Sequence, residues 1–175
     1  MSTMTTKSRL FIDLDGTVAR FYDASPNYLE QMYEKGYFRN LQPYENMTEG
    51  IKLFMEQHKD VEVFALSAKV NGEPPYCEAE KQEWLDEYLP EIDREHRLFT
   101  EIGHNKAEYI PNGISNTDVL YDDYNKNLID WENSGGGHCR NADFRQAVWN
   151  GLSAASHNRW VNHHCFYFRF FDRSG

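Results

Sequence analysis

The sequence predicts an α/β fold in which a central parallel sheet lies between layers of helices. Short apolar runs that end in polar residues alternate along the chain with segments whose apolar residues recur at helical spacing. Such alternation is typical of a parallel sheet, because parallel neighbours must be joined by a long crossover, usually a helix. The length of 175 residues suits one compact domain with room for a small insert.

Four segments are expected to form the strands. Residues 9–15 (RLFIDLD) are an apolar run that closes on acids and is followed by Gly16. Residues 61–67 (VEVFALS) and 98–102 are the second and third candidates, and residues 118–123 (DVLYDD) repeat the pattern of an apolar strand that ends in acids. The functional side chains are expected beyond the carboxyl ends of these strands.

Helical spacing indicates four helices between the strands. They are expected at residues 25–35, 47–59, 76–88 and 106–110. Gly36 and Pro43 separate the first two. The SGGG stretch at residues 134–137 is interpreted as a flexible loop or hinge.

Composition excludes several classes of protein. No apolar run approaches the roughly 18 residues of a membrane span, and residues 1–9 lack the apolar core of a signal peptide. We therefore expect a cytoplasmic protein with no membrane partner. The three cysteines are widely spaced, odd in number and without a C-x-x-C pair, which argues against a disulfide scaffold or a zinc ribbon. The net charge of −10 disfavours nucleic acid as a partner.

The charge changes near His138. Residues 1–138 carry 26 acidic and 13 basic side chains, whereas residues 139–175 carry 2 and 5. We therefore expect a folded core over residues 1–138 and a compositionally distinct tail over residues 139–175. The tail could be an irregular elaboration, a partner-binding segment or an end without selected structure. Its histidines and cysteines lack the compact spacing of a structural zinc site.

Two acidic pairs stand at the ends of predicted strands. They are Asp13 with Asp15, and Asp122 with Asp123. Four converging carboxylates repel one another, so a site that holds them requires a cation. Hard oxygen ligands of this kind favour Mg²⁺, which also accepts phosphate oxygens. The alternatives for these acids are a solvated turn, a calcium loop or a helix cap.

Two further side chains suggest that the ligand is a phosphate. Ser67 ends a predicted strand with a hydroxyl, and Lys106 offers a cation to phosphate oxygens. Asp13 is a candidate carboxylate nucleophile, and Gly16 lets the backbone turn close to a ligand. Alone, Ser67 and Lys106 would be interpreted as a strand-end cap and a solvated helix residue.

Four motifs occur in order over residues 9–130: FIDLDGT, ALSAK, HNKAEYI and VLYDD. They resemble the four motifs of the haloacid dehalogenase-like (HAD) phosphohydrolases. The insert after the first motif, with GHNKAEYI and DDYNKNL, resembles the 5'(3')-deoxyribonucleotidase family, including small phage and bacterial members. The resemblance implies a three-layer Rossmann-like fold with a small helical cap at about residues 19–57. It also implies Mg²⁺-dependent dephosphorylation of deoxyribonucleoside or ribonucleoside monophosphates.

The resemblance also implies roles for the four acids. Asp13 would be the nucleophile and a Mg²⁺ ligand. Asp15 would be the general acid and base, with its backbone carbonyl on the metal. Asp122 would bind Mg²⁺ directly, and Asp123 would bind through water or orient neighbouring groups.

Phosphate would be held by Ser67, Ala68 and Lys106. The cap is rich in rings that could stack on a base: Phe21, Tyr22, Tyr28, Tyr33, Tyr37, Phe38 and Tyr44. Phe21 and Tyr22 are the first candidates because they are closest in sequence to the site. The expected partner is thus a small nucleotide, while the oligomeric state stays open. Another small phosphate ester, or a non-catalytic binding module, is the alternative function.

Overall fold

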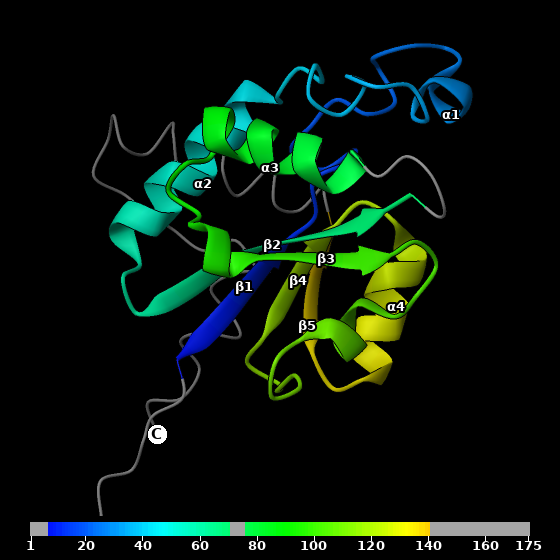
Figure 1. The fold of residues 1–175 in the computed structure, drawn as a ribbon. Coiled ribbons are helices and arrows are strands. Elements are labelled where there is room, and N and C mark those ends of the chain that lie inside the picture. The colour runs from blue at the N-terminus through cyan, green and yellow to red at the C-terminus, as the bar shows by residue number, and fades with distance from the viewer. Residues whose placement is uncertain (1–6, 71–75, 141–175) are drawn as a thin grey trace, which may run out of the picture.

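A five-stranded parallel sheet forms the centre of the computed structural model, which describes residues 7–70 and 76–140 (Figure 1). The strands lie in the order β3-β2-β1-β4-β5. Their bounds are β1 Ser8–Ile12, β2 Val61–Lys69, β3 Arg97–Glu101, β4 Val119–Asp122 and β5 Gly137–Arg140. β1 therefore pairs with β2 on one side and with β4 on the other.

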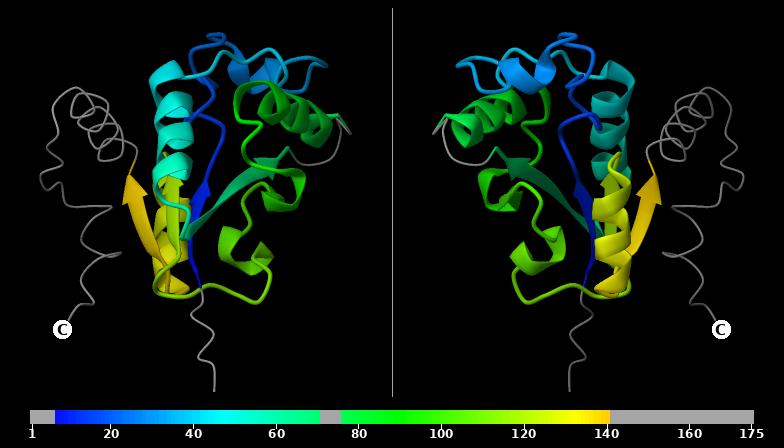
Figure 2. Two further views of the ribbon diagram at one scale, coloured as in Figure 1. Left: turned by 90° about the vertical axis from the view of Figure 1, so that its left-hand side faces the viewer. Right: turned by 90° about the vertical axis from the view of Figure 1, so that its right-hand side faces the viewer.

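Helices cover both faces of the sheet (Figure 2). They are α2 (Glu45–Gln57) and α3 (Cys77–Tyr88) on one face and α4 (Asn125–Asn133) on the other. Leu10 and Ile12 of β1 pack in the core with α2 and α3, while Phe11 packs with Trp131 of α4. This alternation is the period of two that a strand buried on both faces requires. The predicted three-layer α/β architecture is confirmed.

The predicted helix at residues 25–35 is much shorter in the structure. Only α1 (Tyr28–Gln31) is helical there, and none of its residues is buried. Turns follow α1, and Gly36 takes a φ of +93°, which favours glycine and interrupts helical geometry. The predicted helix at residues 106–110 is a short 3₁₀ helix, η2 (Lys106–Tyr109), and a second one, η1 (Arg94–His96), precedes β3.

In the segment between β1 and α2, backbone contacts join the residues at its start to those at its end. Ala19 bridges Pro43, and the Arg20 N–H donates to the Gln42 carbonyl at 2.8 Å. We call residues 20–42 the insert. By contrast α2 packs on the sheet, where its Met47 lies 3.9 Å from the Tyr121 hydroxyl. The part of the predicted cap that stands away from the sheet is therefore the insert.

The glycines after α4 end this helix and start a strand. Gly135 has a φ of +99°, and a Cβ on Gly136 would lie 2.1 Å from Nε1 of the buried Trp131. Gly137 then pairs with Val119 as the first residue of β5. The sequence did not indicate this strand, because its polar residues do not form an apolar run.

Residues 141–175 lie outside the described residues, and so do most of the predicted tail and its histidines. Within residues 7–70 and 76–140, no helix is long and apolar enough to cross a membrane.

Asp118 joins the amino-terminal ends of two neighbouring strands, β1 and β4. Its carboxylate is 1% exposed and accepts hydrogen bonds from Arg9 Nη2 at 2.6 Å and Nε at 3.0 Å. The Ser115 N–H donates to the same carboxylate at 2.6 Å. Arg9 stands on β1, so this ion pair joins the start of β1 to the start of β4.

Asp118→Asn is expected to lower the free energy of unfolding by about 2–4 kcal/mol, because it leaves the Arg9 guanidinium without its anionic partner. The matched control is Asp130→Asn, which breaks an exposed ion pair with Lys126 within α4. That change should alter the free energy by less than about 0.5 kcal/mol. Urea denaturation measures both, and equal losses would contradict the structural role of Asp118.

Candidate active site

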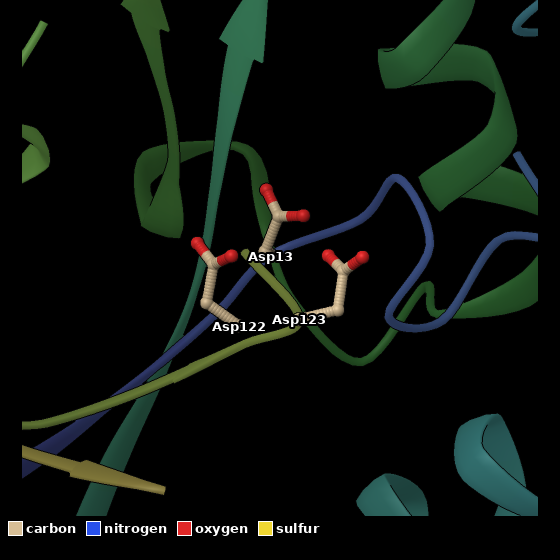
Figure 3. Close-up of side chains that lie close together, drawn as sticks. All are labelled: Asp13, Asp122 and Asp123. Carbon is tan, nitrogen blue, oxygen red and sulfur yellow. The ribbon is translucent and has the colours of Figure 1, made fainter. Parts of the chain in front are cut away.

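Three carboxylates meet beyond the carboxyl ends of β1 and β4. Asp13 follows β1, Asp122 ends β4, and Asp123 comes next along the chain (Figure 3). The two strands are neighbours, and their pairing extends to the Asp13 N–H, which donates to the Tyr121 carbonyl at 2.9 Å. One oxygen from each of the three carboxylates lies within 4.8 Å of the others. The sequence predicted that four acids converge; Asp13, Asp122 and Asp123 do so here, whereas Asp15 is not part of this cluster.

Burial makes this acidic cluster electrostatically unfavourable without a cation. Burial raises the pKa of Asp13 well above its ordinary value; Lys106 opposes this shift, while Asp122, Asp15 and Asp123 add to it. The pKa of Asp123 is also raised, first by burial and then by the charge of Asp122. Three hard oxygen donors at this spacing fit a divalent cation such as Mg²⁺. The side chains present thus suit the predicted metal.

Lys106 lies between two of these acids. Its Nζ donates to Asp13 Oδ1 at 2.6 Å, to Asp122 Oδ2 at 2.7 Å and to the Leu66 carbonyl at 2.9 Å. Burial alone would lower the pKa of Lys106, but Asp13 and Asp122 outweigh it and raise this pKa above its ordinary value. The structure therefore places a lysine that is paired with two carboxylates against the predicted nucleophile.

A second buried lysine was not predicted. Lys81 of α3 is 2% exposed, and its Nζ pairs with the Asp15 carboxylate. It also donates to Ser67 Oγ at 2.9 Å and to the Ala68 carbonyl at 2.6 Å. Lys81 therefore links Asp15, Ser67 and Ala68, whereas the hydrogen bonds of Lys106 go to Asp13, Asp122 and Leu66.

Helical spacing contains the signal that would have found Lys81. Cys77, Trp84 and Leu85 lie four residues before, three after and four after it, and all three are buried. Residues at these spacings share one face of a helix. A lysine in the middle of an apolar helix face needs an anionic partner inside the protein, whereas a single lysine is ordinarily interpreted as solvated.

Asp13 and Asp15 pair with different lysines. The predicted strand over residues 9–15 ends at Ile12, and the chain then turns, with the Leu14 carbonyl accepting the N–H of Val18 and of Ala19 at 2.9 Å. Asp15 is consequently beyond the strand, where it meets Lys81 rather than Lys106. Lys81 comes from α3 on one face of the sheet, and Lys106 comes from η2, which packs with α4 on the other.

Gly16 allows two side chains to come close to the turn. It has a φ of +78°, and a Cβ there would lie 2.5 Å from the Tyr22 ring and 2.6 Å from Asp123 Oδ2. Asp123 Oδ1 accepts a hydrogen bond from Thr17 Oγ1 at 3.3 Å, and its carboxylate also bonds to the Tyr22 side chain. Burial, followed by the charge of Asp123, raises the pKa of Tyr22.

The two candidate base contacts differ in exposure. Phe21 is 8% exposed, and its ring lies within 6.1 Å, centroid to centroid, of the rings of Tyr22, Tyr28, Tyr37 and Phe38. Tyr22 is 46% exposed. A ligand can therefore reach the Tyr22 ring directly, while Phe21 packs inside the insert.

Together these groups can hold a divalent cation next to a tetrahedral anion. The three carboxylates supply oxygen ligands for the cation. Two lysines and the Ser67 hydroxyl supply donors for anionic oxygens. A buried carboxylate at the meeting point of both sets is suited to nucleophilic attack.

Neither a protein-family model nor a curated protein sequence matches this chain. Among solved structures, a chain in the structure of the Pnkp1/Rnl/Hen1 RNA repair complex matches with a TM-score of 0.55 and 16% identity. The match covers 80% of this chain and 44% of that one, so this chain spans less than half of its neighbour's length. It shows a shared fold.

The HAD domain of effector protein Lem4 from Legionella pneumophila matches with a TM-score of 0.47 and 14% identity, over 85% of this chain and 97% of that one. Its inactive mutant matches with a TM-score of 0.45 and 13% identity, over 87% and 98% of the two chains.

Mg²⁺ well above its dissociation constant is expected to stabilise this protein by about 1–3 kcal/mol, because it binds the folded acidic cluster. Asp123→Asn should reduce that gain several-fold and should not destabilise the metal-free protein, since it removes a partly buried charge from the cluster.

The control for this metal test is Asp23→Asn, because Asp23 is an exposed acid of the insert. It should leave the response to Mg²⁺ unchanged. The measurement is the thermal stability of the unaltered protein and both variants with and without Mg²⁺. A metal site would be contradicted if Mg²⁺, Mn²⁺ and Ca²⁺ all left the stability of the unaltered protein unchanged.

Proposed function

We propose that this chain is a HAD-type, metal-dependent phosphomonoesterase that works through an aspartyl-phosphate on Asp13. The observation that carries the proposal is the placement of Asp13, which shares a cluster of carboxylates with Asp122 and Asp123 and is also paired with the buried Lys106. A carboxylate needs such positive charge on both sides to attack a phosphate that is itself anionic.

In the first step a carboxylate oxygen of Asp13 attacks the phosphorus atom. The bond from phosphorus to the ester oxygen breaks, and Asp15 donates a proton to the departing alcohol oxygen. Asp15 lies two residues beyond Asp13 in the turn that follows β1. Its side chain is 22% exposed, so it can exchange protons with solvent between turnovers.

In the second step water attacks the phosphorus atom of the aspartyl-phosphate. Asp15, now a carboxylate, accepts a proton from this water, the bond to the Asp13 oxygen breaks, and inorganic phosphate is released. Asp13 returns to its starting form. The resemblance to HAD phosphohydrolases supports this division of roles between Asp13 and Asp15.

A bound Mg²⁺ would offset the negative charge that gathers between Asp13 and the phosphate oxygens. Asp13 and Asp122 would hold it directly. Asp123 would hold it through water or orient its neighbours, as its bonds to Thr17 and Tyr22 allow.

The two lysines would fix the phosphate from opposite faces of the sheet. Lys106 already bonds to Asp13, so a phosphate oxygen beside that carboxylate falls within its reach. Lys81 bonds to Ser67 Oγ, and together they offer an ammonium and a hydroxyl to a second phosphate oxygen. Lys81 thus joins Ser67, Ala68 and Lys106 as a proposed phosphate-binding residue.

The proposed substrates are deoxyribonucleoside or ribonucleoside monophosphates. The support is the resemblance to 5'(3')-deoxyribonucleotidases and the half-exposed Tyr22 ring beside Asp123, which a nucleobase or sugar could contact. Another small phosphate ester, such as a sugar phosphate, uses the same chemistry and is the alternative. An oligonucleotide with a 3' phosphate is a polymer that carries the same ester group, so it belongs in the same test.

Phosphate release is expected from at least one nucleoside 3' or 5' monophosphate in Mg²⁺, and chelator should abolish it. Asp13→Asn should reduce kcat by at least about 10³-fold while the protein stays folded, because the nucleophile is lost. The measurement is phosphate release from a panel of deoxyribonucleotides, ribonucleotides, sugar phosphates and a 3'-phosphorylated oligonucleotide. Release from sugar phosphates alone would show that the protein is a sugar phosphatase and not a nucleotidase. No release from any substrate would contradict the proposed phosphatase activity.

Lys81→Met keeps the length of the side chain and removes its charge. It is expected to reduce kcat/KM for the best substrate by about 10²-fold, because it removes one donor to the phosphate and releases Asp15 and Ser67. The control, Lys126→Met, changes an exposed lysine of α4 and should leave kcat/KM within about twofold. Equal activity of the two variants would exclude Lys81 from the site.

A further inference from the structure

A buried carboxylate next to Lys81 in the sequence binds the backbone of the insert. Glu80 of α3 is 6% exposed. Its Oε1 accepts the N–H of Gly36 at 2.5 Å, and its Oε2 accepts those of Phe38 at 3.2 Å and Arg39 at 3.5 Å. Among the described residues, the Glu80 carboxylate therefore accepts from three backbone amides of one turn.

The Glu80 carboxylate and the three amides of the turn stabilise each other. A buried carboxylate is stable only when its oxygens are fully hydrogen-bonded, and buried amides that lose their acceptor are destabilised in turn. Gly36 supplies the left-handed geometry of the turn, with its φ of +93°. Few other groups could replace a carboxylate that accepts from three amides at once.

The same turn leads to the candidate active site. The Phe38 ring centroid lies 4.6 Å from Lys81 Nζ. Glu80 therefore binds the backbone of Phe38, while the neighbouring Lys81 contacts its ring. Phe38 stacks on Phe21 at 6.1 Å, and Phe21 contacts the edge of Tyr22 at 5.3 Å. A continuous set of packed rings therefore joins the turn bound by Glu80 to the exposed ring beside Asp123.

α3 holds the insert at further points. Trp84 Nε1 donates to the Leu41 carbonyl at 2.8 Å, and both groups are buried. Arg39 pairs with Glu83 at 3.3 Å and with Glu87 at 2.6 Å, but these ion pairs are exposed. Since exposed pairs contribute little, the buried hydrogen bonds of Glu80 and Trp84 supply the polar part of this attachment, beside the apolar packing of Phe38 and Leu41 in the core.

We infer that Glu80 is a positioning residue that holds the insert as a fixed wall above the site and thereby sets the affinity for the organic part of the substrate. The inference rests on the proposed function. The chemistry at phosphorus uses groups at the strand ends, whereas the Tyr22 ring belongs to the insert. Loosening the insert should therefore weaken binding of a large leaving group more than it slows reaction of a small phosphate.

Glu80→Gln tests this, because it keeps the size of the side chain but replaces one acceptor oxygen by a donor. The matched control is Glu83→Gln, the same change on the same helix at an exposed residue that also contacts the insert. Trp84→Phe is a second, milder variant that removes only the N–H donor to Leu41. The two substrates are the nucleotide that the substrate panel identifies as best and acetyl phosphate, an acyl phosphate whose acetate leaving group is much smaller than a nucleoside.

Glu80→Gln is expected to raise KM for the best nucleotide about tenfold and to change kcat/KM for acetyl phosphate less than about threefold. Exchange of the amide hydrogens of residues 36, 38 and 39, followed by NMR, should accelerate about tenfold or more. Trp84→Phe should shift KM in the same direction, and Glu83→Gln should match the unaltered protein in both measurements.

Equal losses on both substrates, or equal amide exchange in the Glu80 and Glu83 variants, would overturn the inference. If Glu80→Gln fails to fold, Trp84→Phe tests the inference instead. An unchanged KM in the Trp84 variant would then overturn the inference. Failure of the proposed function would look different, because the unaltered protein would then release phosphate from no member of the substrate panel. In that case amide exchange alone decides whether Glu80 anchors the insert.

Discussion

Repulsion among four carboxylates at one end of a parallel sheet is the constraint on which the rest of the site depends. Asp13, Asp122 and Asp123 place oxygens within 4.8 Å of one another, and Asp15 follows two residues after the first of them. Such a cluster is unfavourable in a buried setting unless cations are built into the fold. Lys81 and Lys106 are those cations, and each is almost completely buried.

The three-layer architecture explains how two lysines can serve one cluster. Each face of the sheet has its own helical layer, and each layer contributes one lysine, Lys81 from α3 and Lys106 from η2. β1 runs between them, and the turn after it directs Asp13 to one lysine and Asp15 to the other. The helices that complete the hydrophobic core therefore also complete the electrostatics of the site. A change in the packing of α3 moves Lys81 with it.

The sequence was informative where one local pattern carried both structure and chemistry. Apolar runs that end in acids predicted β1 and β4 with their carboxylates, and the order of motifs predicted Lys106. No sequence signal indicated Glu80, because its role depends on tertiary contacts with backbone amides of the insert. Lys81 was missed for another reason: its spacing from Cys77, Trp84 and Leu85 places it on the apolar face of α3, but a single lysine is ordinarily interpreted as solvated. Polar β5 was missed because its pairing with β4, and not an apolar pattern, makes it a strand.

The formal charges explain how an acidic protein could accept an anionic substrate. Asp13, Asp122 and Asp123 together with Lys106 carry two formal negative charges, which one divalent cation would neutralise. A phosphate monoester dianion would then approach a neutral site with the donors of Ser67 and the lysines already in place, whereas a metal-free cluster would repel it. The attraction is local to the strand ends, while the net charge of −10 acts over the whole protein and disfavours long anionic polymers. This balance favours a small phosphate ester, held at phosphorus by the strand ends and recognised at its organic part by the insert.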